Sequence, residues 1–266
     1  MKKIALFVLC FFLCILICSC TKNDEFYEIN DSKIILHRGL SCIGLSETAP
    51  ENTIPAFEKA ASTTCFGIET DVQETKDGEF VCFHDIDMKY RTNTTGYIQD
   101  YTYEELQDFN ITYGANIKSY NALKIPLLED FLKICKENDK RPFLDIKNIR
   151  NYENFYLLVN KYFEEKEFYI GCSEKGCYES MKVFTKKCIC GLDFDSNNYK
   201  EVYEKSKDDS NVLYCFNKNS NVTKDIIDFF KDNDCKLSTY IVNTREEYNQ
   251  YVNKYDIDYI FTDRLL

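Results

Sequence analysis

The strongest constraint on the fold is a regular alternation of short apolar segments with longer segments of helical period. Eight segments rich in β-branched and aromatic residues predict strands at 33–37, 66–72, 142–146, 168–171, 188–192, 211–216, 236–241 and 259–262. Seven segments between them predict helices at 54–62, 127–138, 152–166, 178–186, 198–205, 223–232 and 245–254.

This alternation places the chain in the α/β class with a parallel sheet, because parallel strands need a crossover between them. Eight such units in about 230 residues predict a closed (β/α)8 TIM barrel, and a doubly wound open sheet is the structural alternative. Two helix starts carry capping signals, namely Asn221 before 223–232, and Thr244 with Glu247 three residues on.

Two features interrupt the alternation after the second strand. Residues 75–83 contain Asp77-Gly78 between two arms and predict a hairpin. Residues 85–124 then form a long polar and aromatic insertion, with one short helix capped by Thr102 and Glu105. Long insertions in barrels lie on the catalytic face, where loops vary without disturbing the core.

The first 19 residues have the pattern of a signal peptide. Lys2 and Lys3 precede fourteen apolar residues at 4–17, too few to span a bilayer. Residues 17–20 resemble the bacterial lipoprotein box, which implies cleavage before Cys20 and lipid on that cysteine. We therefore expect an exported protein, lipid-anchored to a bacterial membrane, with a polar tether at 20–32 and one barrel domain at 33–266; an ordinary secretory signal or an uncleaved anchor is the alternative.

The charge balance excludes nucleic acid as an expected partner. The chain has 33 basic and 44 acidic residues, a net charge of -11, and loss of Lys2 and Lys3 with the leader makes it 31 minus 44, or -13. No stretch concentrates Lys and Arg into a basic stripe. An anionic substrate would therefore depend on a few local cations or a bound metal.

Ten cysteines follow Cys20, and in an exported protein they would ordinarily suggest disulfides. Several lie in apolar runs, where cysteine acts as a small hydrophobic residue, so we predict free thiols. A zinc site built from Cys172, Cys177, Cys188 and Cys190 is disfavoured, because C-x2-C spacing and a nearby histidine are absent.

Polar clusters follow the carboxyl ends of the first three barrel strands, where a barrel gathers them at one mouth. They lie at 37–39, 51–53, 69–71, 84–85 and 145–147. Side chains alternate along a strand, so Glu69 and Asp71 point the same way, as do Asp145 and Lys147. Three converging carboxylates need a cation or protons, and all-oxygen ligands favour Mg²⁺ or Ca²⁺.

Only two histidines are present, His37 and His84, and each lies in one of these clusters. Imidazoles titrate near neutral pH, so one can remove a proton from a nucleophile while the other protonates a leaving alkoxide. A metal and Arg38 can balance charge on phosphoryl oxygens. The residue types therefore suit cleavage of a phosphodiester.

An ordered set of motifs resembles the glycerophosphodiester phosphodiesterase family over residues 34–263. The set comprises His37-Arg38-Gly39, Pro50-Glu51-Asn52-Thr53, Glu69-x-Asp71, His84-Asp85, Arg91-Thr92, Thr102-x-x-Glu105-Leu106, Ile125-Pro126-Leu127-Leu128-Glu129 and Thr262-Asp263. The resemblance implies a (β/α)8 barrel that hydrolyses glycerophosphodiesters, with a divalent metal, to an alcohol and glycerol 3-phosphate.

The resemblance also implies roles for individual residues. His37 and His84 would be the catalytic acid and base, in an order that stays open, and Arg38 and Lys147 would contact the phosphate. Glu69, Asp71 and Asp145 would bind the metal, with Glu51 beside it.

Three departures from the family pattern affect these expectations. Asp145 is one methylene shorter than the usual glutamate. Tyr240 stands where the family often has tryptophan and would line the alcohol pocket. Leu266 follows Asp263 by only three residues, so barrel closure would rely on a short tail or leave the last strand partly bare.

Two rival functions remain at this stage. The same site could let a substrate hydroxyl attack the phosphorus, as in phospholipase-D-like lyases that form a cyclic phosphate. Alternatively, the chain could be a non-catalytic surface lipoprotein that binds headgroups or a partner protein. Retention of His37, His84 and Lys147 argues against the non-catalytic reading.

Overall fold

The computed structural model describes residues 29–172, 176–184 and 189–266. The predicted signal peptide, Cys20 and most of the 20–32 tether lie outside the described residues, as does Cys188. The nine cysteines within them are free thiols. Within these ranges no helix is long and apolar enough to cross a membrane.

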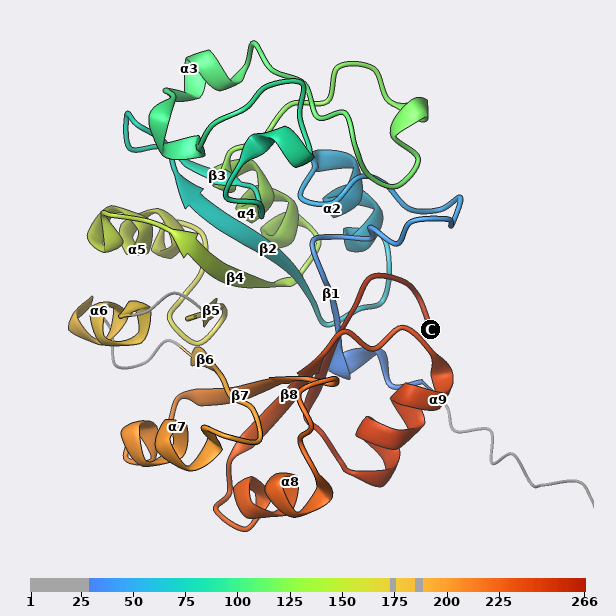
Figure 1. Cartoon of the computed structure of the whole chain (residues 1–266), viewed down its shortest axis with the longest axis vertical. Coiled ribbons are helices and arrows are strands. Elements are labelled where there is room, and N and C mark those ends of the chain that lie inside the picture. Colours follow the sequence, from blue (N-terminus) through green and yellow to red (C-terminus); the bar gives the residue numbers. More distant parts are fainter. Residues whose placement is uncertain (1–28, 173–175, 185–188) are drawn as a thin grey trace, which may run out of the picture.

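Eight parallel strands form a closed barrel, which confirms the predicted fold and rules out the open sheet (Figure 1). Strand β1 pairs with β2 on one side and with β9 on the other, so the sheet closes on itself. A ninth strand, β3, pairs antiparallel with β2. The strands are β1 Ile34–Leu36, β2 Gly67–Glu74, β3 Phe80–Cys82, β4 Arg141–Asn148, β5 Tyr169–Gly171, β6 Ile189–Asp193, β7 Val212–Asn217, β8 Lys236–Tyr240 and β9 Tyr259–Thr262.

The helices between these strands cover the outside of the barrel (Figure 1). They are α2 Ile54–Ala61, α4 Leu128–Glu137, α5 Tyr152–Asn160, α6 Cys177–Phe184, α7 Tyr199–Ser206, α8 Lys224–Lys231 and α9 Arg245–Tyr248, which continues as a π-helix over Asn249–Lys254. Their apolar faces and the outward side chains of the strands form the main hydrophobic core. In that core the rings of Phe57 and Phe131 join α2 to α4, with centroids 4.6 Å apart.

The structure corrects three details of the helix predictions. Helix α5 ends at Asn160 rather than at 166, because Phe163 turns into the core and the chain must return to β5. Asn221 is not a cap; it has a φ of 56°, and Thr223 occupies the cap position. Thr244 does cap α9, but Glu247 accepts from the Asn243 N–H instead of completing a box.

The predicted hairpin is present and carries the insertion. β2 and β4 are the longest strands of the barrel, and the end of β2 pairs with β3, with Val72 opposite Cys82. The insertion has a small core of its own and lies beside β2 and β3, near α2 (Figure 1). Its short helix α3, Tyr103–Leu106, has both bonds of the Thr102–Glu105 capping box. The hairpin therefore delivers His84 to the end of β3.

The last strand is not bare on its outer side. Ile260 of β9 is fully buried in the main core, in the same cluster as Tyr248 and Val252. Leu266 packs against this cluster, and the Asp263 carbonyl accepts from the Cys42 N–H at 2.9 Å. Pairing of β1 with β9 thus closes the barrel, and the tail covers part of the seam.

The inside of the barrel is filled at one end and open at the other. Aromatic and aliphatic side chains occupy the layer next to the amino ends of the strands, where Phe143 and Tyr169 stack with centroids 4.0 Å apart. One layer further, β5 and β6 contribute Gly171 and Gly191, which are neighbours in the sheet. Since glycine has no side chain, space remains at the carboxyl ends of the strands.

The backbone turn after β1 requires glycine at position 39. Gly39 has a φ of 81°, and a Cβ there would lie 2.7 Å from the Ala56 carbonyl carbon, whereas Gly44, with a φ of 96°, has open space around it. We expect Gly39→Ala to lower the free energy of unfolding by about 3 kcal/mol, from strain plus overlap, and Gly44→Ala by about 1 kcal/mol, from strain alone. Urea unfolding measures both, and equal losses would contradict the predicted overlap.

Candidate active site

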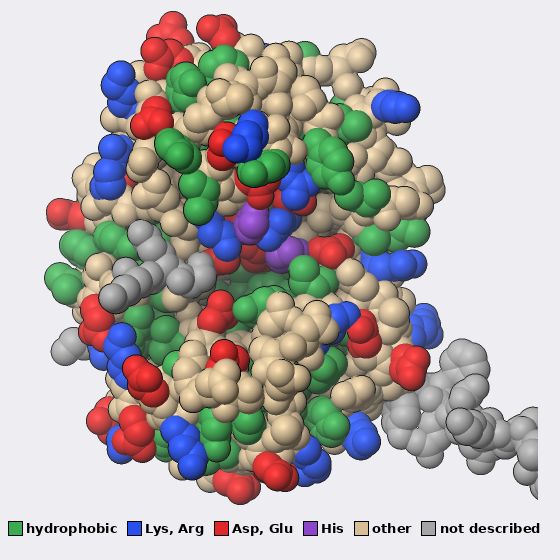
Figure 2. All heavy atoms as spheres, in the orientation of Figure 1, with side chains coloured by type: hydrophobic (Ala, Val, Ile, Leu, Met, Phe, Trp, Pro, Cys, Tyr) green, Lys and Arg blue, Asp and Glu red, His purple; other side chains and the backbone are tan. Residues whose placement is uncertain are grey.

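A cavity of about 330 Å³ opens at the carboxyl ends of the barrel strands. Figure 2 shows it as a hollow in which histidine, basic and acidic side chains gather on one side, above a hydrophobic floor. Seven residues predicted from the sequence line it, namely His37, Arg38, Glu69, His84, Asp145, Lys147 and Tyr240. Asp71 is buried behind the lining, and Glu51 contacts Arg38 beside it.

Three carboxylates meet at the charged side of the cavity. Glu69, Asp71 and Asp145 each offer an oxygen, and these oxygens lie within 4.8 Å of one another. Strand pairing explains the convergence, because Asp71 on β2 stands opposite Asp145 on β4. Asp145 therefore reaches the cluster despite its short side chain. Burial and then the charge of Asp71 raise the pKa of Glu69 to about 8.

The donor set fits a hard divalent cation. Three clustered oxygen donors, two of them nearly inaccessible, carry negative charge that the surrounding protein does not fully balance. Burial of Glu69, and then the neighbouring charge of Asp71, both make the ionised form of Glu69 less favourable. A divalent ion bound among the three oxygens would balance this negative charge.

Two cations already contact the cluster. Lys147 Nζ lies 2.6 Å from Asp145 Oδ2 and 3.3 Å from Asp71 Oδ1. Arg38 Nε lies 3.1 Å from Asp71 Oδ2, yet this buried N–H has no hydrogen-bond partner, so the contact is electrostatic only. Despite burial, Arg38 and Lys147 lower the pKa of Asp71. Asp71 and Glu51 thus fix the position of the Arg38 guanidinium, and the Arg38 side chain lines the cavity.

The Glu51-Asn52-Thr53 motif orients these groups, and each residue has a separate task. Glu51 Oε1 accepts from Arg38 at 2.9 Å. Asn52 Nδ2 donates to Asp71 Oδ2 at 2.7 Å, and its Oδ1 accepts from the Thr70 hydroxyl. Thr53 caps α2. The loop after β1 is thereby tied to β2 in one arrangement.

His37 is held by residues from the far end of the chain. Its Nδ1 lies 2.7 Å from Asp263 Oδ1, and Asn243 Nδ2 donates to the other oxygen of Asp263 at 2.9 Å. Its Nε2 lies 3.9 Å from Glu69. Burial alone would lower the pKa of His37, but the Glu69 charge and the Asp263 hydrogen bond raise it above the ordinary value.

His84 has a parallel support on the hairpin. Its Nδ1 lies 2.7 Å from Asp85 Oδ1, and Arg91 Nε contacts Asp85 Oδ2 at 3.1 Å. Arg91 also reaches Glu51 at 3.3 Å, so Glu51 joins the arginine beside each histidine. In this structure Glu51 is an arginine partner, and its place beside a metal stays a prediction.

Sequence reasoning gave no role to four supporting residues. Asp263, Asp85 and Arg91 lie in the motifs and Asn243 lies outside them, and nothing local in the sequence shows which side chain each one contacts. Asp85 was the easiest of the four to predict from the sequence, since it directly follows His84. The partnership of His37 with Asp263 spans 226 positions and required the closed barrel.

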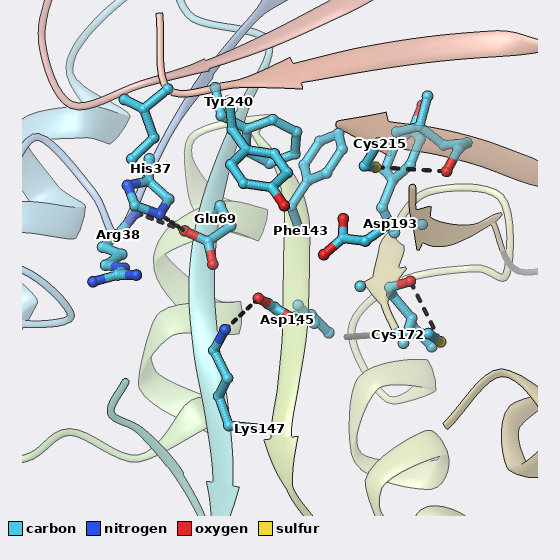
Figure 3. Close-up of a pocket in the computed structure, with 18 of the residues that line it drawn as sticks. His37, Arg38, Glu69, Phe143, Asp145, Lys147, Cys172, Asp193, Cys215 and Tyr240 are labelled. Atoms are coloured by element: carbon cyan, nitrogen blue, oxygen red, sulfur yellow. Dashed lines mark hydrogen bonds and ion pairs between the residues drawn. The ribbon is translucent and has the colours of Figure 1, made fainter. Parts of the chain in front are cut away.

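The opposite wall of the cavity carries a carboxylate that the sequence reasoning missed. Asp193 ends β6 and faces the Tyr240 hydroxyl across the opening (Figure 3). The Asp193 side chain is exposed to solvent in the cavity. The surrounding residues still remove part of its hydration, and this burial, followed by the charge of Asp145, raises the pKa of Asp193 to about 6. Asp193 directly follows the predicted strand at 188–192, so the rule that gathers polar residues from strand carboxyl ends at the mouth would have found it.

The sequence from 37 to 266 matches the glycerophosphoryl diester phosphodiesterase family. Bacillus subtilis YqiK, described as an uncharacterized protein, is 38% identical over 44% of this chain, about half (46%) of its own length. A glycerophosphodiester phosphodiesterase of Caldanaerobacter subterraneus subsp. tengcongensis is 27% identical over 86% of this chain and 93% of that protein.

A solved structure shares the fold. It is an Oleispira antarctica phosphodiesterase in complex with the product sn-glycerol-3-phosphate. It superposes with a TM-score of 0.76 at 18% identity and covers 87% of this chain and 92% of that one. At this identity the likeness supports the barrel and not the chemistry.

The contact between His37 and Asp263 predicts a change in titration. In metal-free protein, Asp263→Asn removes a negative charge that favours the imidazolium, so the pKa of His37 should fall. NMR titration measures it, and His84→Ala identifies the His37 signal because the chain has only two histidines. Glu246→Gln, which removes an exposed carboxylate on α9, is the control. An unchanged pKa in Asp263→Asn would contradict the assigned contact.

Proposed function

This chain belongs to the glycerophosphoryl diester phosphodiesterase family, whose members are phosphoric diester hydrolases, and we propose that it hydrolyses glycerophosphodiesters to an alcohol and glycerol 3-phosphate. One observation carries the proposal. Both histidines, two cations and the carboxylate cluster meet at one cavity, from three barrel strands and the hairpin. We propose His37 and His84 as the acid and base, and a divalent metal as cofactor.

Arg38 and Lys147 would bind the phosphate. Both side chains line the cavity, Arg38 from the loop after β1 and Lys147 from β4. Both are held in place by Asp71, so little side-chain freedom would be lost on binding. These cations would supply the local attraction that a chain of net charge -11 lacks overall.

The metal would be held by Glu69, Asp71 and Asp145. Their all-oxygen donor set favours Mg²⁺ or Ca²⁺. When bound, such an ion stabilises negative charge on the phosphoryl oxygens. Glu69 and Asp145 line the cavity, so a ligand held by Arg38 and Lys147 would lie next to this site.

The two histidines would move the protons of hydrolysis. Asp263 and Asp85 each bind an Nδ1 atom, so the Nε2 atoms are the ones left to exchange protons. One Nε2 would accept a proton as a water oxygen bonds to phosphorus. The other would donate a proton to the alkoxide as the phosphorus–oxygen bond to the alcohol breaks.

Tyr240 supports the proposed place of the alcohol. It lines the cavity, as a residue predicted to contact the alcohol must. The pocket volume of about 330 Å³ leaves room for a small diester. The product complex of the Oleispira antarctica phosphodiesterase concerns that protein and is consistent with a substrate of this class.

We also propose that the protein is exported and lipid-anchored through Cys20. The support is the sequence alone, in particular the apolar run at 4–17 and the lipoprotein box at 17–20. A multiply acylated amino terminus binds a membrane stably. The barrel would then work at a bacterial membrane surface on the short tether.

Loss of either histidine tests the mechanism. We expect His37→Ala and His84→Ala each to lower the turnover of glycerophosphocholine by a factor on the order of a hundred or more, since each removes a proton-transfer group. Release of glycerol 3-phosphate gives the rate, and urea unfolding checks the fold. Near-normal turnover in either variant would contradict the mechanism. A cyclic phosphate in place of glycerol 3-phosphate would favour the lyase.

Metal binding can be tested without measuring activity. Saturating Mg²⁺ or Ca²⁺ should raise the melting temperature, because an ion bound at a hundred times its dissociation constant stabilises the folded state by about 2.7 kcal/mol. Glu69→Gln removes a ligand and should abolish most of this rise. Glu79→Gln, an exposed carboxylate beyond β2, should keep it. Equal shifts in both variants would place the metal elsewhere.

The anchor predicts a modified amino terminus. Mass spectrometry of membrane-extracted protein should show a chain that begins at an acylated Cys20, and Cys20→Ala should release the protein from the membrane fraction. An unmodified terminus, or one at another residue, would contradict the lipid assignment.

A further inference from the structure

The far wall of the cavity carries a negative charge that hydrolysis of the phosphate does not need. Asp193 lies at the end of β6, where solvent in the cavity reaches it. Within residues 29–172, 176–184 and 189–266, no Lys or Arg forms an ion pair with it. A carboxylate at this position repels the anionic phosphate, so it suits a neutral or positively charged part of the substrate.

The position of Asp193 relative to the phosphate contacts is set by the sheet. Strands β4 and β6 are separated by β5, hence by two strand spacings or about 10 Å between backbones. Lys147 and Asp193 extend inward from these strands and shorten the gap. The four bonds from phosphorus to nitrogen in an ethanolamine phosphate reach about 5 Å. A phosphate at Lys147 could therefore present an amino group to Asp193.

Aromatic rings complete this side of the cavity. The Tyr240 hydroxyl points toward Asp193, and Phe143 lies in the floor between them (Figure 3). The Tyr240 and Phe261 rings are 6.5 Å apart and both line the space. The Tyr240 hydroxyl oxygen and the Asp193 carboxylate therefore face the same space, where both could accept hydrogen bonds from an ammonium group.

Gly171 and Gly191 leave room for an amino group between the phosphate contacts and Asp193. A Cβ at Gly171 would lie 3.0 Å from Asp145 Oδ1, and one at Gly191 would lie 3.4 Å from Cys215 Sγ. Any larger residue at either position would narrow the passage between the phosphate contacts and Asp193. The hollow is thus continuous from Lys147 to Asp193.

We propose that Asp193 and Tyr240 form a subsite for the positively charged amino group of the alcohol, so that diesters of amino alcohols are preferred over diesters of glycerol. A neutral hydroxyl could donate to Asp193 but would gain nothing from its charge, whereas an ammonium group gains from that charge. This subsite deepens the proposed function and rests on it for the placement of the phosphate.

A binding experiment tests the subsite independently of catalysis. Phosphoethanolamine and propyl phosphate have the same phosphate and nearly the same length, and differ in an ammonium in place of a methyl group. Calorimetry with Mg²⁺ present should show that the protein binds phosphoethanolamine about tenfold more tightly, equivalent to about 1.4 kcal/mol. Equal or undetectable binding of the two ligands would overturn the proposal.

Two variants assign the preference to Asp193. Asp193→Asn keeps the shape and removes the charge, so the preference for phosphoethanolamine should disappear. Glu201→Gln removes an exposed charge from α7, outside the barrel, and should keep it. Retention of the preference in Asp193→Asn, or its loss in Glu201→Gln, would overturn the assignment.

Kinetics separate this proposal from the proposed function. Asp193→Asn should lower kcat/KM for glycerophosphoethanolamine about tenfold, mainly through KM, and change it less than twofold for glycerophosphoglycerol. Equal losses on the two substrates would contradict the subsite. Selective binding of phosphoethanolamine without turnover of either diester would contradict the proposed function and leave the subsite standing.

Discussion

The structure depends on how one buried carboxylate, Asp71, is balanced. Its side chain is 1% exposed and lies against Asn52, Arg38 and Lys147, at 2.7, 3.1 and 3.3 Å. An unpaired charge at this depth would cost several kcal/mol. Because two of the partners come from the loop after β1 and the third from β4, balancing Asp71 also brings the charged side of the cavity together.

The carboxylate cluster has more negative charge than its two cations neutralise, and this excess links folding to ligand binding. Glu69 and Asp145 add negative charge beside Asp71, and Arg38 and Lys147 are shared among all three carboxylates. Removing one member of a buried charge network destabilises the fold more than replacing the whole network by apolar residues of similar volume. We therefore expect the excess negative charge of the cluster to lower the free energy of unfolding of the metal-free protein. A bound cation would raise that free energy and stabilise the site.

The cavity has two sides with different electrostatics. On one side, Arg38, Lys147 and the carboxylate cluster suit a metal and a phosphate; on the other, Asp193 and Tyr240 suit a cation or a donor. Gly171 on β5 and Gly191 on β6 leave open space between the two sides. The proposed substrate, with an anionic phosphate and a cationic alcohol, would match this distribution of charge, although the chain as a whole is acidic.

Local patterns in the sequence determined much of this protein. All eight barrel strands were predicted within about two residues of their ends, because apolar side chains must recur with the period of a half-buried or buried strand. The gathering of His37, Arg38, Glu69, Asp145 and Lys147 also followed, since the carboxyl ends of barrel strands meet at one mouth. Only tertiary structure decided which side chains touch. Asp263 supports His37 because β9 closes against β1, 226 residues away from it in the chain, and Asp193 faces Tyr240 because the barrel curves β6 toward β8. Such contacts depend on strand register and barrel curvature, which no local period encodes.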